Sequence, residues 1–176
     1  MAWTTPGTAV AGDVLTAAFW NLNVRDNTQA LKDNVTSLTA AIPTRSTNTG
    51  STTATTSTTF TDTGLSVSIT PTATTSLIEV TFNIWMGCSQ TAIGSLNLMR
   101  GATNIAQGAT CTCGNIVTSG RMDLMAATFI DSPATTSATT YKLQWKTSAG
   151  TIYLNRRGDA NDVNPFSYLQ VREIVQ

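Results

Sequence analysis

The most polar run of the sequence is 156–164, which reads Arg-Arg-Gly-Asp-Ala-Asn-Asp-Val-Asn. Asp159 and Asp162, with the amides between and after them, offer the oxygen ligands that Ca²⁺ prefers. The run lacks an acidic residue at the distance from which a calcium loop supplies its bidentate ligand, so we expect a solvated loop and no metal site. Arg156, Arg157, Asp159 and Asp162 remain candidates for surface recognition or for a contact between subunits.

Catalytic chemistry has few residues to draw on in this chain. Histidine is absent, which removes the commonest general base, the Ser-His and Cys-His nucleophile pairs, and most zinc and iron sites. The ten acidic residues are scattered along the sequence rather than clustered. We therefore expect no enzyme, no catalytic residue and no cofactor.

Charge and hydropathy narrow the partners further. Ten basic and ten acidic side chains among 176 residues give a net charge of zero, so nucleic acid is not an expected partner. The longest strongly apolar stretch, Leu124 to Ile130, is too short to span a bilayer, and the first positive side chain is Arg25, so we expect neither membrane insertion nor a secretory signal. We therefore expect the protein to be made and kept in a cytoplasm unless something else carries it out. Cys88, Cys111 and Cys113 are expected to be small buried or half-buried thiols.

The four tryptophans suggest different roles. Trp145 alternates with polar residues on the face of Tyr141 and is expected in the core. Trp85 shares a strand face with polar side chains, so we expect an intersubunit contact there, with a glycan platform as the alternative. Trp3 and Trp20 are candidate anchors of a docking surface, or pack against each other.

An extended arm and one long helix should present these N-terminal side chains. Residues 1–13 contain two glycines and a proline and lack a helical period, whereas Val14 to Ile42 has neither Gly nor Pro and ends before Pro43. The helix carries a short heptad seam. Its members are Val24, Leu31, Val35, Leu38 and Ile42. Such a short seam needs partners, either further copies of the chain or, in the alternative, the body of the same chain.

The rest of the sequence has the period of β-strands. Residues 44–59 hold twelve Ser or Thr and are expected to be a linker whose C-terminal part can form a solvent-facing edge strand. Beyond it, alternation of apolar and polar residues predicts about eight strands at roughly ten-residue spacing. The expected fold is mainly β, an antiparallel jelly-roll-like sandwich preceded by an arm and one helix. The expected domains are 1–43, 44–59 and 60–176.

Two segments resemble proteins of tailed bacteriophages. The opening, with Trp3-Thr4-Thr5-Pro6, then 11–18 (Ala-Gly-Asp-Val-Leu-Thr-Ala-Ala), resembles an N-terminal signature of small phage structural proteins over about the first 35 residues. It differs in having Ala9 and Val10 where the pattern carries an aromatic residue, and Asp13 where it has Glu. The C-terminal part, with 140–145 (Thr-Tyr-Lys-Leu-Gln-Trp) and the closing 168–174, looks like the trimeric β-sandwich modules of phage fibres and head-decorating proteins.

This resemblance implies a homotrimer on the virion exterior, made in the cytoplasm of the bacterial host. The arm, with Trp3, Pro6 and Trp20, would attach to the major capsid protein or to a tail protein, and the sandwich would face outward. We expect a capsid decoration or cement protein. The alternative is a tail-fibre adhesin that recognises a host surface glycan.

Overall fold

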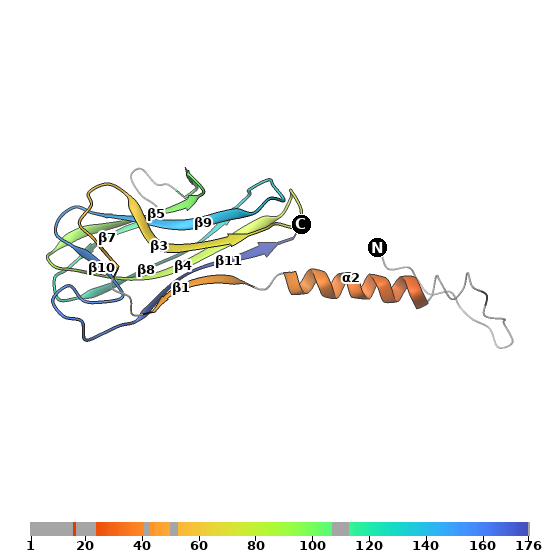
Figure 1. Ribbon diagram of the computed structural model, residues 1–176, viewed down its shortest axis with the longest axis horizontal. Helices are drawn as coiled ribbons and strands as arrows, with labels where there is room; N and C mark the ends of the chain where they lie inside the picture. Colours follow the sequence, from red (N-terminus) through yellow and green to blue (C-terminus); the bar gives the residue numbers. More distant parts are fainter. Residues whose placement is uncertain (1–15, 17–23, 41–42, 50–52, 107–112, 176) are drawn as a thin grey trace. The chain divides into compact units, whose positions relative to one another are not determined.

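The computed structural model describes residue 16 and residues 24–40, 43–49, 53–106 and 113–175. The chain divides into two compact units, Met1–Ile42 and Pro43–Gln176. The first contains a helix and the second is a β-sandwich (Figure 1).

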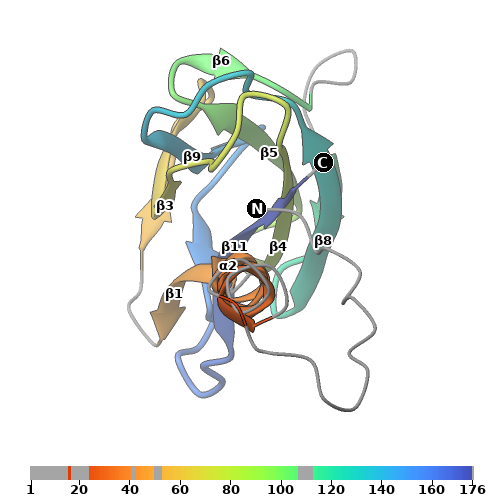
Figure 2. The same cartoon turned by 90° about the vertical axis from the view of Figure 1, so that its right-hand side faces the viewer.

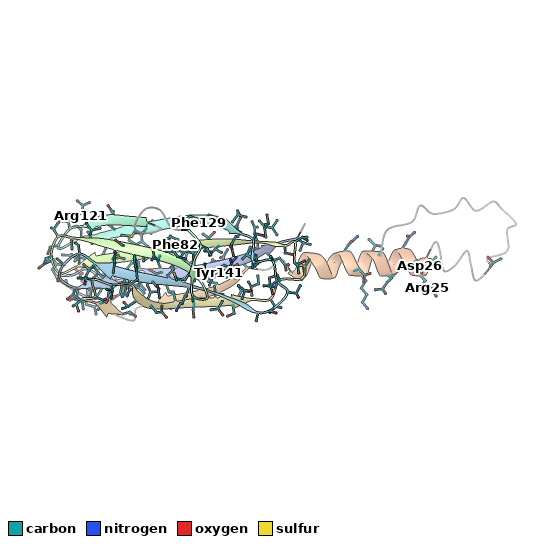
Figure 3. The ribbon with its side chains drawn as sticks, turned by 90° about the horizontal axis from the view of Figure 1, so that it is seen from above. Arg25, Asp26, Phe82, Arg121, Phe129 and Tyr141 are labelled. Atoms are coloured by element: carbon teal, nitrogen blue, oxygen red, sulfur yellow. The ribbon has the colours of Figure 1, made fainter. Side chains whose placement is uncertain are left out.

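Helix α2 (Asp26–Ala40) occupies the C-terminal half of the segment for which we expected a helix, preceded by a π-type turn at Val24 and Arg25. Asp26 lies in the first turn, where its charge favours the positive end of the helix dipole, and Arg25 pairs with it at 3.1 Å (Figure 3). Gln29 donates to Asp33 one turn later at 2.7 Å. Thr16 is not helical, and the remainder of the expected N-terminal half lies outside the described residues.

Sheet A is built around the long strand β4 (Leu77–Cys88). On one side β4 pairs with β11 (Phe166–Ile174), which pairs with β1 (Thr44–Thr49), and with β10 (Ile152–Leu154), which pairs with β2 (Ala54–Thr55). β8 (Met122–Asp131) pairs with β4 over residues that also pair with β11, so β8 lies on the opposite side of β4.

Sheet B has the order β3 (Thr61–Ile69), β9 (Thr139–Thr147), β5 (Ala92–Arg100) and β6 (Thr103–Asn104), and β7 (Cys113–Val117) also pairs with β5. Every described pairing in both sheets is antiparallel. Figure 2 shows the two sheets as facing layers. The prediction of a mainly β, antiparallel sandwich preceded by a helix is confirmed in the described residues, where eleven strands stand against the eight or so that we expected.

The core lies between the sheets and follows the alternation of the sequence. In β9, Tyr141, Leu143 and Trp145 are buried while the intervening Lys and Gln are only partly covered. Phe82 of β4 and Phe129 of β8 stack inside the sandwich with ring centroids 6.3 Å apart (Figure 3). The expectation that Trp145 belongs to the core is confirmed, and Cys88 is a buried free thiol as expected.

The segment 44–59 differs from the linker that we expected, because part of it is hydrogen-bonded into sheet A. Thr44–Thr49 pairs with β11 along six residues, and Ala54–Thr55 pairs with β10. Threonine's branched Cβ suits an extended backbone, and an edge strand needs no apolar residues when its outer side meets water. A strand therefore forms at the N-terminal end of the segment, where we had expected none, and a short edge strand, Ala54–Thr55, forms in its C-terminal part, where we had expected one.

Candidate docking surfaces

The heptad seam on α2 is exposed in its described part. The exposed fractions are 39% for Val24, 54% for Leu31 and 61% for Val35. Ala30, outside the seam, is fully buried. The side chains of Leu38 and Ile42, and the arm residues Trp3, Pro6 and Trp20, lie outside the described residues. The helix thus presents an apolar stripe of three branched side chains.

The polar loop at 156–162 is closed on itself by one arginine. The Arg157 guanidinium donates to both carboxylate oxygens of Asp159, at 3.0 and 2.7 Å, and to Asp162 at 3.3 Å. Hydrogen bonds from Arg157 hold the pKa of Asp159 below its usual range. The carboxylates that a calcium ion would need are therefore engaged by a cation. Within the described part of the chain, no group of three or more His, Cys, Asp or Glu side chains could hold a metal.

Two glycines fix this loop against β4. A Cβ on Gly158 would overlap the backbone carbonyl of Cys88, and one on Gly87 would overlap that of Arg156. Only glycine permits backbones to approach so closely. The Arg156 guanidinium lies 4.3 Å from the centroid of the Tyr153 ring, and its Nε donates to the Arg157 carbonyl at 2.9 Å. The four candidate residues are thus brought together: Arg157 pairs with Asp159 and Asp162, and Arg156 lies over the Tyr153 ring of β10.

Trp85 lies on the outer face of sheet A, together with apolar residues that the sequence analysis did not select. It is half-buried and pairs in register with Leu124 of β8, which is 44% exposed. Its neighbour two residues back, Asn83, pairs with Ala126 on one side and Tyr168 on the other. Phe166, 53% exposed, stacks with Tyr168 at 6.3 Å. We call this set the apolar face: Trp85, Leu124, Ala126, Phe166 and Tyr168.

Polar side chains at the border of the apolar face are paired with one another. Arg45 of β1 donates to Gln170 at 2.9 and 3.2 Å, and its guanidinium lies 4.6 Å from the centroid of the Tyr168 ring. Arg172 forms an ion pair with Glu79 at 3.0 Å. The hydroxyls of Thr81 and Thr128 are 3.0 Å apart. These pairs leave the apolar side chains as the part of this surface that a partner would contact.

The outer face of sheet B has a different character. Asp62 accepts from Lys142 at 2.9 Å and from Gln144 at 2.8 Å, and the hydroxyls of Ser68 and Thr140 are 2.7 Å apart. Hydrogen bonds from Lys142 and Gln144 lower the pKa of Asp62. Across β3 and β9 this side of the sandwich is a ladder of paired polar groups, suited to water, and Ile93 of β5 is exposed beside it.

One polar cluster joins the two sheets. Asp131 of β8 accepts from the Tyr141 hydroxyl at 2.6 Å and from Arg100 at 2.8 and 2.9 Å. Burial raises the pKa of Tyr141 well above its ordinary value, and the hydrogen bond to Asp131 raises it further. Tyr141 therefore stays protonated and acts as a donor, which makes the cluster a clasp between sheets and not an acid–base pair.

The apolar face could have been found only in part from sequence. The run Leu124 to Ile130 is uncharged and has apolar residues both at positions that point inward and at positions that point outward. A strand of this kind has an apolar outer face as well as an apolar face toward the core. Which residues of β4 and β11 lie beside it depends on the pairing register, which no local pattern contains.

No helix in the described ranges is both long and apolar enough to cross a membrane.

No protein-family model matches this chain, and no curated protein matches its sequence. Among solved structures, a T=1 particle derived from infectious bursal virus is similar, with 17% identity and a TM-score of 0.40 over 78% of this chain and 37% of that chain. The Gt strain of infectious bursal disease virus gives 16% identity and a TM-score of 0.43 over 78% and 39%. The VP2 subviral particle of that virus gives 16% and 0.41 over 78% and 38%. This chain thus spans less than two fifths of the length of these viral proteins.

Proposed function

We propose that this protein is a non-enzymatic structural protein on the exterior of a tailed-bacteriophage virion, where it acts as a trimeric capsid decoration or cement protein. The observation that carries the proposal is the exposed stripe of Val24, Leu31 and Val35 on a helix that belongs to a different unit from the β-sandwich. An exposed apolar stripe of heptad spacing is typical of a helix that associates with other copies.

The mechanism is attachment through the N-terminal region. The arm, anchored by Trp3, Pro6 and Trp20, lies across subunits of the major capsid protein, and the helix trimerises along its seam. The resemblance of the first 35 residues to phage structural proteins supports this role. Trimerisation joins three arms, so a weak contact of one arm becomes strong through effective concentration.

A structural role also agrees with the chemistry of the described side chains. Several carboxylates are held by cations of the same chain: Asp62 by Lys142, Glu79 by Arg172, Asp131 by Arg100, and Asp159 and Asp162 by Arg157. Neutralised carboxylates of this kind stabilise loops and sheets, and they are poor general bases.

The copy number of the chain in purified virions tests this proposal. Quantitative mass spectrometry against the major capsid protein should give hundreds of copies per particle, because decoration sites repeat over the whole head. A few to a few dozen copies would assign the chain to the tail and contradict the decoration role.

The alternative function is a tail-fibre or receptor-binding adhesin. The exposed Phe166 and half-buried Trp85 favour it, because aromatic rings stack on sugars. Adsorption of the purified protein to host cells, with competitive block of infection at low concentration, would support the adhesin and count against the cement protein.

A further inference from the structure

We infer that the apolar face of sheet A is the surface through which neighbouring copies of this chain contact one another. The inference rests on the trimer proposed above and adds a second interface to it, formed by the β-sandwiches. Its occupant is a second copy of the same chain, whose Leu124, Trp85 and Phe166 would be covered in the assembly.

The contrast between the two outer faces is the first reason. Sheet A groups Leu124 and Phe166 next to Trp85, whereas sheet B exposes the paired groups of Asp62, Lys142 and Gln144. The large exposed apolar side chain described on sheet B is Ile93 of β5. A sandwich surrounded by water has no need of this asymmetry, but a sandwich with one covered face does.

The second reason is the chemistry of the border. The hydrogen-bonding groups at the border of the apolar face are paired, Arg45 with Gln170 and Thr81 with Thr128. The side-chain oxygen of Asn83, between Ala126 and Tyr168, has no hydrogen-bond partner among the described residues, but it is buried and therefore closed to a sugar. The Tyr168 ring is covered by the Arg45 guanidinium, at 4.6 Å. A glycan needs free donors and acceptors beside an open ring, whereas an apolar protein surface needs the border to be satisfied. The arrangement therefore fits a protein partner.

The third reason is the edge of the sheet. Among the described residues, β8 is hydrogen-bonded only to β4, so its other side is an edge. Edge strands are commonly guarded by lysine, proline or inward charges. In β8 the acidic residues Asp123 and Asp131 lie near its two ends, and the run Leu124 to Ile130 between them contains no lysine, proline or charge. Ile130, 55% exposed, extends the apolar surface along this edge. An edge that is uncharged along its middle and lies next to an exposed apolar face is typical of an interface.

The fourth reason is the short tether, which makes a second copy the available partner. α2 ends at Ala40 and β1 begins at Thr44, so the connection between them spans at most about 14 Å. Helices that associate lie about 8–10 Å apart. A helical trimer would therefore hold three copies of β1, and with it three copies of sheet A, at high local concentration.

The test is the self-association of the full-length chain. Sedimentation equilibrium over a range of concentrations should give a trimer, and Leu124→Arg should raise the concentration of half-dissociation at least about tenfold, because a charge would lose its water in the interface. Phe166→Arg is a second variant with the same expected effect. Both side chains are about half exposed, so circular dichroism and thermal unfolding should show an intact fold.

Ile93→Arg is the matched control, because Ile93 is an exposed aliphatic residue, at 49%, in β5 of sheet B. It should leave the association unchanged. Hydrogen exchange of 122–131 should be slow in the wild-type trimer and faster in Leu124→Arg. Equal half-dissociation for Leu124→Arg and wild type would overturn the inference, as would a wild type that is monomeric throughout.

A glycan site gives a third, distinct outcome. If Leu124→Arg and Phe166→Arg keep the trimer but lose adsorption to host surface polysaccharide, the face binds sugar and the inference is wrong. The copy number per virion is measured independently, so the proposed function can stand or fall without this interface.

Discussion

Side chains of the types used in active sites are bound to one another within this fold, where they join strands and loops. The Tyr141 hydroxyl, the Asp131 carboxylate and the Arg100 guanidinium form a cluster of the kind found in active sites, yet each is committed to a partner on the opposite sheet. Within the 156–162 loop, Arg157 likewise forms ion pairs with Asp159 and Asp162. Their common effect is to fix strands and loops in one arrangement.

Removing parts of the clasp should lower stability in graded steps. Tyr141→Phe deletes one hydrogen bond and should lower the free energy of unfolding by about 1–2 kcal/mol. Asp131→Ala leaves Arg100 and Tyr141 without their acceptor and should cost about 2–4 kcal/mol. Chemical denaturation measures both. Lys142→Ala, which removes a more exposed pair with Asp62, should cost less than about 1 kcal/mol and serves as the control. Equal losses for Asp131→Ala and Lys142→Ala would contradict the clasp.

Glu173 should contribute to the acid sensitivity of the fold. Burial raises its pKa, but hydrogen bonds from residues 72–76, among them the backbone N–H and hydroxyl of Thr72 at 2.6 and 2.8 Å, lower it by more. Because the folded pKa lies below the ordinary value of 4.5, the contribution is present above that pH and is lost as pH falls through the folded pKa.

Denaturation at a series of pH values tests this assignment. Glu173→Gln should flatten the loss of stability below about pH 4.5, and Thr72→Ala should do so partially, because it removes one of the donors. An unchanged acid limb in Glu173→Gln would show that other carboxylates dominate it.

At the scale of elements, helix α2 is the element that should be least stable without a packing partner. It contains fifteen residues with several Thr and Asn, and a helix of that length and composition is marginal in water without a packing partner. Leu31 and Val35 of α2, with Val24 of the turn before it, supply the surface that such a partner would cover.

Charges placed in the seam should separate assembly from folding. The double variant Leu31→Asp and Leu38→Asp should keep a folded sandwich but lose the trimer or its attachment to the particle, measured by light scattering and virion occupancy. Gln29→Lys with Thr36→Lys is the control, since it places two charges at the same seven-residue spacing away from the seam, each one turn from Asp33 and therefore attracted to it. An unchanged trimer with full occupancy in the seam variant would exclude the helix as the assembly element.

The sequence predicted those strands in which apolar and polar residues alternate regularly. The alternation around Leu65, Val80 and Trp145 predicted β3, β4 and β9 and their buried faces correctly. β1 lacked such a pattern, because its threonines gain their order from pairing with β11 and not from burying an apolar face.

Only one residue of the apolar face could be predicted from the sequence, because its own type and position were unusual. Trp85 stood out because a large aromatic side chain on a polar strand face is unusual. Leu124, Ala126 and Tyr168 join it through cross-strand register, which is a property of the folded sheets. The polar run at 156–162 was recognised from sequence, but its closure by Arg157 required the loop geometry.

At the scale of the whole molecule, the composition fits a chain that works in an assembled state. The net charge is zero and 11% of residues are charged, so little electrostatic repulsion keeps copies apart. Threonine hydroxyls supply polarity on strand faces and edges instead. A helical seam and an apolar sheet face would each be covered in the proposed trimer, which links the residue, element and molecular scales.

Electron cryomicroscopy of intact particles that carry this chain with a label at its C-terminus tests the central claim most directly. We predict label density in groups of three β-sandwiches, repeated over the outer surface of the head, with the N-terminal region against the capsid. Label confined to the tail, or single isolated sandwiches on the head, would contradict the account.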